Sequence, residues 1–263
     1  MINIENIALE LDKYDIFEGM TSISAVIKSI LLEKSNRQIF AVLYDEDRSE
    51  KKSRELAFIK KNSLDMSFDV LPVSSDILSR LTLGDSHGGI IAICSKRAFN
   101  DSFVNNLTNT SFYALIDGIE DPYNFAYSIR SLYAAGVDGI ILPPRNWMDY
   151  SGTVARSSAG TSELADIYVC DTVEAVKTFK NAGFNIVSAS IRDSVSIYEY
   201  DFSSPTLLIV GGEKRGISRK LLELSDANVR IEYGREFMGS LPSASAVSVI
   251  AFEIARQRSA TKL

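Results

Sequence analysis

The chain has 263 residues, 46% hydrophobic and 24% charged, and this composition excludes a disordered chain, a collagen-like repeat and a coiled coil. Its formal net charge of -6 argues against indiscriminate binding to nucleic-acid phosphates, although a local basic patch is compatible with it. Two cysteines in separate segments and a single histidine provide neither a disulfide framework nor a set of metal ligands, so we expect no metal.

Helices and strands are predicted to alternate over residues 1–97. Apolar residues at 23, 26, 27, 30 and 31 follow helical spacing, after a capping residue at Thr21 or Ser22. Further helices are expected at 51–61 and 76–83, and short apolar runs predict strands at 39–44, 70–71 and 90–94. This alternation is typical of a parallel or mixed sheet covered by helices, so we expect a separate α/β domain here.

A second α/β domain is predicted at 112–263, after a linker at 98–111 that is rich in Asn, Ser and Thr. A helix is expected to begin at Asp121-Pro122, because aspartate caps exposed amides and proline suits the first helical turn, and to end before Gly136. Strands are predicted at 113–116, 139–142, 167–170, 185–189, 207–210 and 229–231, and helices at 173–182, 218–224 and 243–257.

Neither a membrane span nor a secretory leader is expected. The apolar runs fall far short of the ~20 residues that cross a bilayer. Between Met1 and Asp12 the chain carries acidic residues and no basic one, unlike the basic start of a signal peptide. We therefore expect a cytoplasmic protein with no membrane partner.

Three segments contain polar residues and glycines that a buried core does not need. The first runs from Asp117 to Asn124 and continues to Arg130 on the following helix. Ligands of open α/β sheets commonly bind beyond the carboxyl ends of strands, so this segment is a candidate site. A helix cap followed by a surface arginine is the alternative.

The second segment, Gly211 to Ile217, places glycines directly after a strand, where they allow close approach to a ligand or form a simple turn. Its spacing matches neither the dinucleotide-binding nor the P-loop fingerprint. The third segment, Gly234 to Ala246, opens a helix with small residues. The exposed amides there favour a polar or anionic ligand, and tight helix packing is the alternative.

In this order, the three segments resemble the signature motifs of the SpoU (TrmH) family of RNA ribose 2′-O-methyltransferases, in the SPOUT superfamily. Motif 1, D-P-x-N-x-G followed by an arginine, is similar to Asp121-Pro122-Tyr123-Asn124-Phe125-Ala126 with Arg130. Motif 2, G-x-E-x-x-G, is similar to residues 211–216, and motif 3, S-L-N before an apolar helix, is similar to Ser240-Leu241. The family's S-A-G-A segment is similar to Ser157-Ser158-Ala159-Gly160-Thr161.

The resemblance implies an enzyme that uses S-adenosylmethionine, contains a deep trefoil knot and forms its active site across a homodimer. It implies catalytic roles for Arg130, Asn124, Glu213 and Ser240. It also implies that the methyl donor is held by Ala189, Gly211, Ile231 and Leu241. Two roles for Arg130 stay open: a clamp on the RNA phosphate that orients the 2′-hydroxyl, or the base itself.

The first hundred residues resemble the ribosomal-protein-like substrate-binding domain of many rRNA-directed members. His87-Gly88-Gly89-Ile90-Ile91-Ala92 is similar to the H-Q-G-x-x-A that closes it. We therefore expect ribosomal RNA, of the 23S type, as the substrate. The basic residues nominated for RNA contact are Lys51, Lys52, Arg54, Lys214 and Arg215, together with Lys60 and Lys61. For the cluster before residue 62, a solvated helix face is the alternative.

Two positions depart from the family pattern. Ala126 stands for the glycine of motif 1, a change that a helix tolerates. Pro242 stands for the asparagine of motif 3 and removes a side-chain amide and a backbone donor. These departures keep open an alternative function, that of a catalytically weak or inactive RNA-binding or ribosome-assembly protein on the same scaffold.

Overall fold

The computed structural model describes residue 7 and residues 10–82, 87–144, 150–236 and 238–260. The chain divides into two compact units, Met1–Ala98 with Trp147–Leu164, and Phe99–Asn146 with Ala165–Leu263. These units differ from the expected domains mainly in Trp147–Leu164, which groups with the N-terminal unit, and the expected domain boundaries stay predictions. Leu83, the last residue of one predicted helix, lies outside the described residues.

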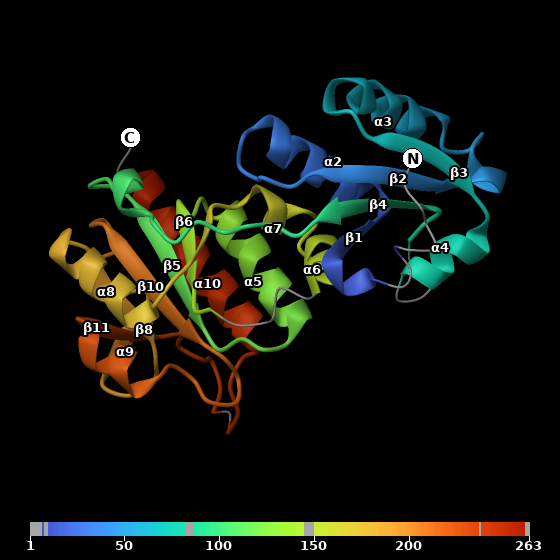
Figure 1. Ribbon diagram of the computed structural model, residues 1–263. Helices are drawn as coiled ribbons and strands as arrows, with labels where there is room; N and C mark the ends of the chain where they lie inside the picture. The colour runs from blue at the N-terminus through green and yellow to red at the C-terminus, as the bar shows by residue number, and fades with distance from the viewer. Residues whose placement is uncertain (1–6, 8–9, 83–86, 145–149, 237, 261–263) are drawn as a thin grey trace. The chain divides into compact units, whose positions relative to one another are not determined.

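The N-terminal unit contains a four-stranded mixed sheet in the order β1-β4-β2-β3 (Figure 1). Strand β4 is antiparallel to β1 and β2, whereas β3 is parallel to β2, so the sheet is the mixed one of the two expected types. Its strands are β1 (Tyr14–Glu18), β2 (Ile39–Asp45), β3 (Asp69–Val73) and β4 (Ile90–Ser95). Its helices are α2 (Gly19–Leu31), α3 (Ser53–Met66), α4 (Ser75–Leu81), α6 (Ser151–Ser157) and α7 (Thr161–Leu164).

Both faces of this sheet are buried. Ile90, Ala92 and Cys94 of β4 pack with residues of α2 and α3, whereas the alternate residues Ile91 and Ile93 pack with residues of α4. Alternate residues of a strand point to opposite faces, so the continuous apolar run of β4 is what a strand covered on both sides requires.

Strand β1 is not predicted by the sequence pattern, because a charged residue, Asp15, occupies one of its two buried positions and Phe17 the other. Asp15 is paired with Arg37, whose side chain is completely buried, at 2.5 Å. Arg37 also pairs with Glu163 of α7 at 2.8 Å and lies over the ring of Phe17, 4.8 Å from its centroid. The buried carboxylates are thus neutralised and hydrogen-bonded, as burial of charge demands.

Helices α6 and α7 pack closely against β1 and α2 of the same unit. A Cβ atom on Gly152 would lie 2.1 Å from the carbonyl oxygen of Ile16, and one on Gly160 would lie 2.4 Å from the Cβ atom of Ala25. Gly160 also has a φ of +83°, which favours glycine. Gly160, in the segment that resembles S-A-G-A, therefore lies in a tight turn against α2.

The C-terminal unit contains a seven-stranded sheet in the order β7-β6-β5-β10-β8-β11-β9, in which every strand pair is parallel. Its strands are β5 (Phe112–Asp117), β6 (Gly139–Leu142), β7 (Ile167–Val169), β8 (Asn185–Ala189), β9 (Ser194–Ser196), β10 (Thr206–Gly211) and β11 (Ala227–Arg230). Its helices are α5 (Pro122–Ala134), α8 (Thr172–Asn181), α9 (Arg219–Leu224) and α10 (Ser243–Ala260). The expected α/β class is confirmed, although β9 is not among the predicted strands.

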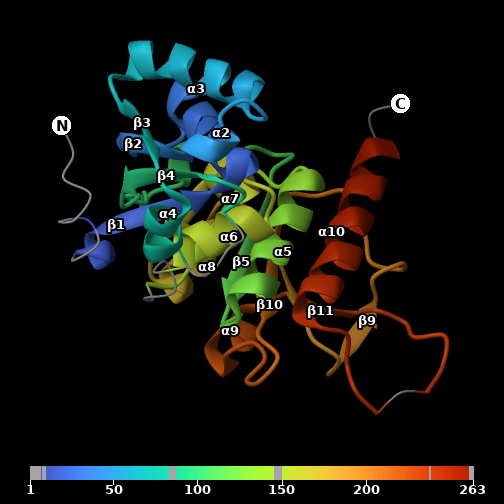
Figure 2. The ribbon, with the colours of Figure 1, turned by 90° about the vertical axis from the view of Figure 1, so that its right-hand side faces the viewer.

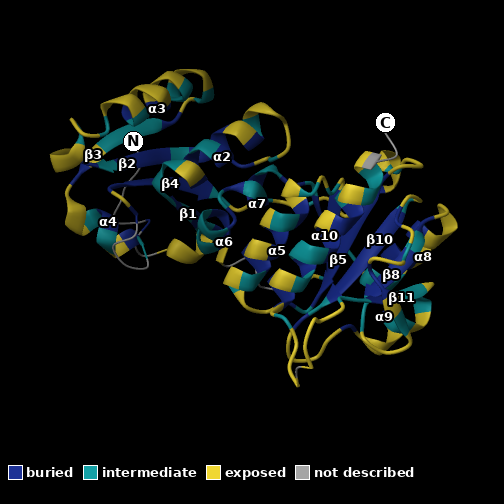
Figure 3. Cartoon of the chain, turned by 180° about the vertical axis from the view of Figure 1, so that it is seen from behind, coloured by how far each residue is buried: buried dark blue, intermediate teal, exposed yellow. Residues whose placement is uncertain are grey.

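Helices cover both faces of the parallel sheet. Helices α8 and α9 share one apolar core with Tyr113 and Leu115 of β5 and with Ile209 of β10. Helices α5 and α10 lie side by side on the other face (Figures 1 and 2). The central strands β5 and β10 are buried along almost their whole length (Figure 3).

Helix α5 begins and ends where the sequence predicts. The Asp121 carboxylate accepts a hydrogen bond from the backbone N–H of Asn124 at 2.8 Å, and Pro122 occupies the first turn. Gly136 adopts a φ of +84° just after the helix. The N–H of Val137 donates to the carbonyl of Leu132, so the helix ends in a left-handed cap. This cap fixes the direction in which the chain leaves α5.

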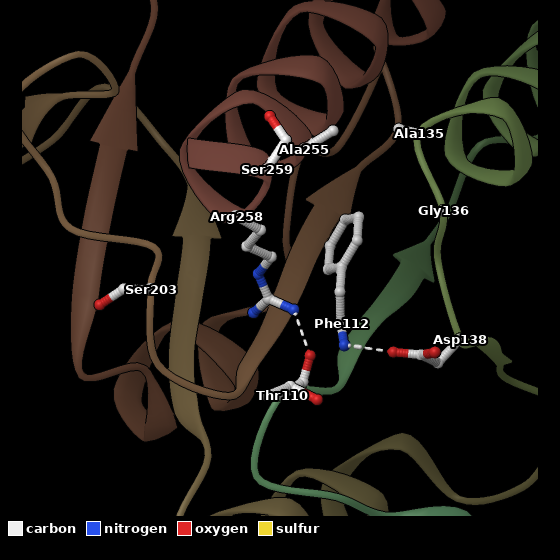
Figure 4. A pocket seen from close by; sticks show the side chains of 9 residues that line it. All are labelled: Thr110, Phe112, Ala135, Gly136, Asp138, Ser203, Ala255, Arg258 and Ser259. Atoms are coloured by element: carbon white, nitrogen blue, oxygen red, sulfur yellow. Dashed lines mark hydrogen bonds between the residues drawn. The ribbon is translucent and has the colours of Figure 1, made fainter. Parts of the chain in front are cut away.

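A cavity of about 430 Å³ lies at the amino edge of the sheet, where β5 begins (Figure 4). Arg258 of α10 points into it and donates to the carbonyls of Thr110, Phe202 and Ser204 at 2.8–3.1 Å. The Asp138 carboxylate accepts from the N–H of Phe112 at 2.7 Å. The bonds of Arg258 tie the last turn of α10 to the loops at this edge.

The described residues show no sign of a metal centre. No group of three or more His, Cys, Asp or Glu side chains within the described ranges could hold a metal ion. Cys94 and Cys170 are both free thiols. Among the helices that the structure describes, none is long and apolar enough to cross a membrane.

Candidate active site

The loops that follow β5 and β10 pack directly against each other at the carboxyl edge of the parallel sheet. A Cβ atom on Gly212 would lie 1.9 Å from the carbonyl oxygen of Gly118, and one on Gly211 would lie 2.3 Å from the carbonyl carbon of Gly216. The Asp117 carboxylate accepts from the N–H of Ser218 at 2.8 Å. Gly211 and Gly212 are therefore needed, because the Cβ atom of any other residue would collide with the backbone of the neighbouring loop segment.

Glu213 connects the three segments that the sequence singles out. Its Oε1 atom accepts a hydrogen bond from Nδ2 of Asn124 at 2.9 Å. The same oxygen accepts from the backbone N–H of Ser243 at 3.3 Å and from the Ser243 hydroxyl. Partial burial raises the pKa of Glu213, but the hydrogen bonds from Ser243, from its own backbone and from Asn124 outweigh burial and bring the pKa below its usual value. Glu213 is thereby held as a carboxylate.

Arg130 lies on α5, two turns beyond its start, and is exposed. Six positions on a helix separate it from Asn124 by roughly 120° and ~9 Å along the axis, so only its long side chain could bring the two groups to one ligand. No other described residue forms a hydrogen bond or ion pair with the Arg130 side chain. Its guanidinium is available to a ligand that approaches α5.

A cavity of about 320 Å³ opens beside Glu213. Besides Glu213, four residues nominated from the sequence line it: Ala189 at the end of β8, Gly211 at the end of β10, and Ser240 and Leu241 before α10. Apolar side chains, including Val210, Ile217, Leu222 and Val247, form much of its wall. Ile231, which follows β11 and is half-buried, is not among the described residues that line the cavity. Its role as a donor-binding residue stays a prediction.

The nominated basic residues form two groups, one in each unit. Lys51 and Lys52 precede α3, and Arg54, Lys60 and Lys61 lie on it. Of these, Lys52 is largely covered and pairs with Glu55 at 3.2 Å, whereas the others are exposed. Lys214 and Arg215 are exposed in the loop after β10, where Lys214 lies 3.9 Å from Glu120. Both groups are accessible to a ligand.

Comparison with known proteins identifies the family. The profile of the SpoU rRNA Methylase family matches residues 111–252, a range that contains all three motif segments. The chain is 31% identical over 183 residues to a protein of Staphylococcus saprophyticus assigned to the TrmH family of tRNA/rRNA methyltransferases, an alignment that covers 67% of this chain and 73% of the relative. The chain belongs to the SpoU rRNA methylase family. The resemblance inferred from the motifs is confirmed.

Similarity to relatives of this SpoU protein extends over both units. The chain is 26% identical over 247 residues to a 23S rRNA (guanosine-2′-O-)-methyltransferase of Xylella fastidiosa. This alignment covers 92% of this chain and 97% of the relative. Its fold matches the AdoMet-bound rRNA methyltransferase of Sinorhizobium meliloti with a TM-score of 0.77 at 22% identity, covering 96% of this chain and 94% of that one. The SpoU methyltransferase AviRb of Streptomyces viridochromogenes matches with a TM-score of 0.75 at 23% identity, covering 94% and 92%.

One residue of this SpoU site is missed by the sequence analysis. Ser243, the first residue of α10, contributes two donors to Glu213, but a serine at the start of a helix looks like an ordinary cap. The signal that could have found it is its position directly after Pro242, where the motif loses its amide. The other departure, Ala126, is fully buried in α5.

Proposed function

We propose that this chain transfers a methyl group from S-adenosylmethionine to the 2′-hydroxyl of a ribose in ribosomal RNA, of the 23S type. The observation that carries the proposal is the convergence of Asn124, Glu213 and the start of α10 beside the cavity lined by Ala189, Gly211 and Leu241. This is the combination of residues that the family motifs nominate, and helices that begin more than a hundred residues apart contribute to it.

The cavity suits the proposed methyl donor. Its volume of about 320 Å³ lies within the range of small-molecule sites. Apolar walls from Ile217, Leu222 and Val247 suit an aromatic base, and the close backbone at Gly211 provides polar groups for the remainder. When bound, S-adenosylmethionine would supply an electrophilic methyl group on a sulfonium sulfur. Ala189, Gly211 and Leu241 would hold it, with Ile231 as a further candidate.

The residues around the cavity have distinct tasks in this reaction. A ribose hydroxyl is a weak nucleophile, so holding it in line with the methyl group provides much of the acceleration. Arg130, with five N–H donors, would clamp the RNA phosphate and orient the hydroxyl. Asn124 fixes the Glu213 carboxylate, which in turn accepts from the start of α10. Ser240 lines the cavity and completes its rim.

Arg130 provides the direct test. We expect Arg130→Ala to abolish transfer of labelled methyl groups to ribosomal RNA, because the hydroxyl would no longer be oriented. Binding of S-adenosylmethionine, measured by calorimetry, should be unchanged, because Arg130 is not among the described residues that line the cavity. Arg130→Lys keeps the charge but not the planar fork, and should restore only part of the rate. Equal, low transfer by the wild type and the alanine variant would refute the enzymatic proposal.

A homodimer belongs to the same proposal. Helices α5 and α10 expose large aromatic residues, Tyr123 at 45%, Tyr127 at 47% and Phe252 at 52%, which a second copy would cover. The exposed Arg130 lies on the same helix as the two tyrosines, so a partner placed there would bring its own surface to the active site. Light scattering of the purified chain would give the oligomeric state directly.

The knot and the cellular location extend the proposal. Strand β10 lies between β5 and β8, and the loops at 211–217 and 231–242 carry donor-binding candidates. This arrangement is compatible with a trefoil knot at the carboxyl-terminal side of the unit. A 23S rRNA substrate would place the protein in the cytoplasm, and the N-terminal unit would act as the ribosomal-protein-like domain that binds RNA.

The alternative function rests on one observation, Pro242 in place of the motif 3 asparagine. A non-catalytic RNA-binding or ribosome-assembly protein would bind RNA without binding the methyl donor. Calorimetry with S-adenosylmethionine distinguishes the two, since measurable binding to the cavity supports the enzyme and its absence supports the assembly protein.

A further inference from the structure

Pro242 removes two donors from the start of α10, yet Glu213 is not left with Asn124 alone. The next residue, Ser243, is 9% exposed and directs both its backbone N–H and its hydroxyl at Oε1 of Glu213. Asn124 donates to the same oxygen from α5. A carboxylate oxygen that accepts from two sides has a fixed orientation, because rotation would break all of these bonds at once.

We propose that Ser243 is a positioning residue, which orients the Glu213 carboxylate in the active site directly after the position where Pro242 lacks a side-chain amide and a backbone N–H. This inference rests on the proposed function. Ser243 also lines the cavity, but its backbone N–H and its hydroxyl both point to Glu213, so it acts on the reaction through that carboxylate. The chain is therefore expected to be an active enzyme in spite of its altered motif.

The two donors of Ser243 have different chemical origins, which makes the inference testable. The backbone N–H is one of the free amides of a helix start and would seek an acceptor in any case. The hydroxyl is specific to serine or threonine. Ser243→Ala removes the hydroxyl and keeps the amide, whereas Ser243→Thr keeps both. Ser245, an exposed residue on the same first turn, provides the matched control Ser245→Ala.

The first measurement is the kinetics of methyl transfer to ribosomal RNA. We expect Ser243→Ala to lower kcat by about 10- to 100-fold, the size of one lost hydrogen bond to a charged group. KM for RNA and the Kd for S-adenosylmethionine should stay near those of the wild type, and Tm should fall by a few degrees at most, because one hydrogen bond to Glu213 is lost. Ser243→Thr should restore kcat, and Ser245→Ala should match the wild type.

The second measurement follows Glu213 without any methyl donor. Carboxyl carbon resonances of ¹³C-labelled glutamate are titrated in the ligand-free protein, with Glu213→Gln assigning the signal. In Ser243→Ala the pKa of Glu213 should rise toward its usual value, because the largest of the lowering hydrogen bonds is removed. Lys214 and Glu120, the charged pair on the neighbouring loops, are unchanged in Ser243→Ala, so they do not cause a difference in the pKa of Glu213 between the two proteins.

The outcomes separate the inference from the function that underlies it. An active wild type whose kcat is unchanged by Ser243→Ala overturns the inference alone. A parallel fall of kcat, donor affinity and Tm that threonine does not rescue assigns Ser243 a purely structural role and also overturns it. A wild type that neither binds the donor nor transfers methyl groups overturns the proposed function and this inference together.

Discussion

A single carboxylate, Glu213, accepts hydrogen bonds from two helices that begin more than a hundred residues apart in the chain. Each partner is held by local chemistry: Asn124 by the Asp121 cap of α5, and Ser243 by the first turn of α10. The orientation of the carboxylate therefore depends on the positions of both helix starts. A change that shifts either helix should alter the hydrogen bonds of Glu213 and with them its pKa.

The ionised state of Glu213 makes a pH-dependent contribution to stability. Its folded pKa lies below the ordinary value of 4.5, so the stabilisation is present above that value and is lost as the pH falls through the folded pKa. We expect Glu213→Gln to lower the urea midpoint at about pH 7 and to have progressively less effect as the pH falls below about 4, where the wild-type carboxyl also becomes neutral. An equal loss at neutral and acidic pH would contradict this account.

The sequence predicts Asn124 and Glu213 as site residues because the family motif names them, but it does not predict how they connect. Ser243 lies 30 residues from Glu213, and no periodic pattern encodes a contact of that kind. Taken alone, its neighbour Pro242 indicates only that motif 3 has lost a side-chain amide and a backbone N–H. Only the fold shows that the adjacent serine donates to Glu213.

At the scale of elements, a contact between residues far apart in the chain also explains why the sequence pattern does not predict β1. The pattern of β1 alternates, but its inward positions hold Asp15 and Phe17, and a charged residue in a core position hides the alternation. The partner that makes Asp15 tolerable, Arg37, comes from a different part of the chain. Strands with purely apolar inward faces, such as β4 and β10, are found by the pattern to within one residue at either end.

Arg37 fastens the short helix α7 to the N-terminal sheet. Burial lowers the pKa of Arg37, but Glu163 and Asp15 more than compensate by charge attraction and hydrogen bonding, so the net pKa is raised. The guanidinium stays charged and depends on both carboxylates. Glu163 thus contributes the electrostatic part of the docking, while Gly152 and Gly160 allow the close approach.

Removal of Glu163 should therefore destabilise the N-terminal unit strongly. Glu163→Ala leaves a buried guanidinium with one partner fewer, and a loss of about 3–5 kcal/mol in the free energy of unfolding is expected. Urea denaturation measures it. Glu174→Ala, which removes the partner of Lys177 in an exposed pair, should cost much less. Equal losses in the two variants would mean that Arg37 does not depend on Glu163.

At the scale of the whole molecule, an acidic protein must still bind a polyanion if the proposed function holds. The net charge is -6, so any RNA affinity has to come from local groups of basic residues rather than from the overall field. In the N-terminal unit, Lys51 and Arg54 are exposed at the start of α3, whereas Lys52 forms an ion pair with Glu55. Lys51 and Arg54 are therefore the better candidates for phosphate contact.

Charge reversal at these two positions tests the RNA-binding role of α3. We expect Lys51→Glu with Arg54→Glu to weaken binding to ribosomal RNA and to flatten the dependence of log K on log salt, by about 0.7 to 0.9 for each phosphate that the protein no longer neutralises. Lys177→Glu with Lys180→Glu on α8 changes the net charge equally by breaking exposed pairs, and serves as the control. Binding titrations at several salt concentrations give both slopes.

The outcomes assign the role of α3. If the α3 variant keeps the wild-type slope, its basic residues form a solvated helix face. If both variants flatten the slope equally, overall charge governs the binding. A change confined to the α3 variant places RNA on this helix, because only local phosphate contacts release counterions in this way.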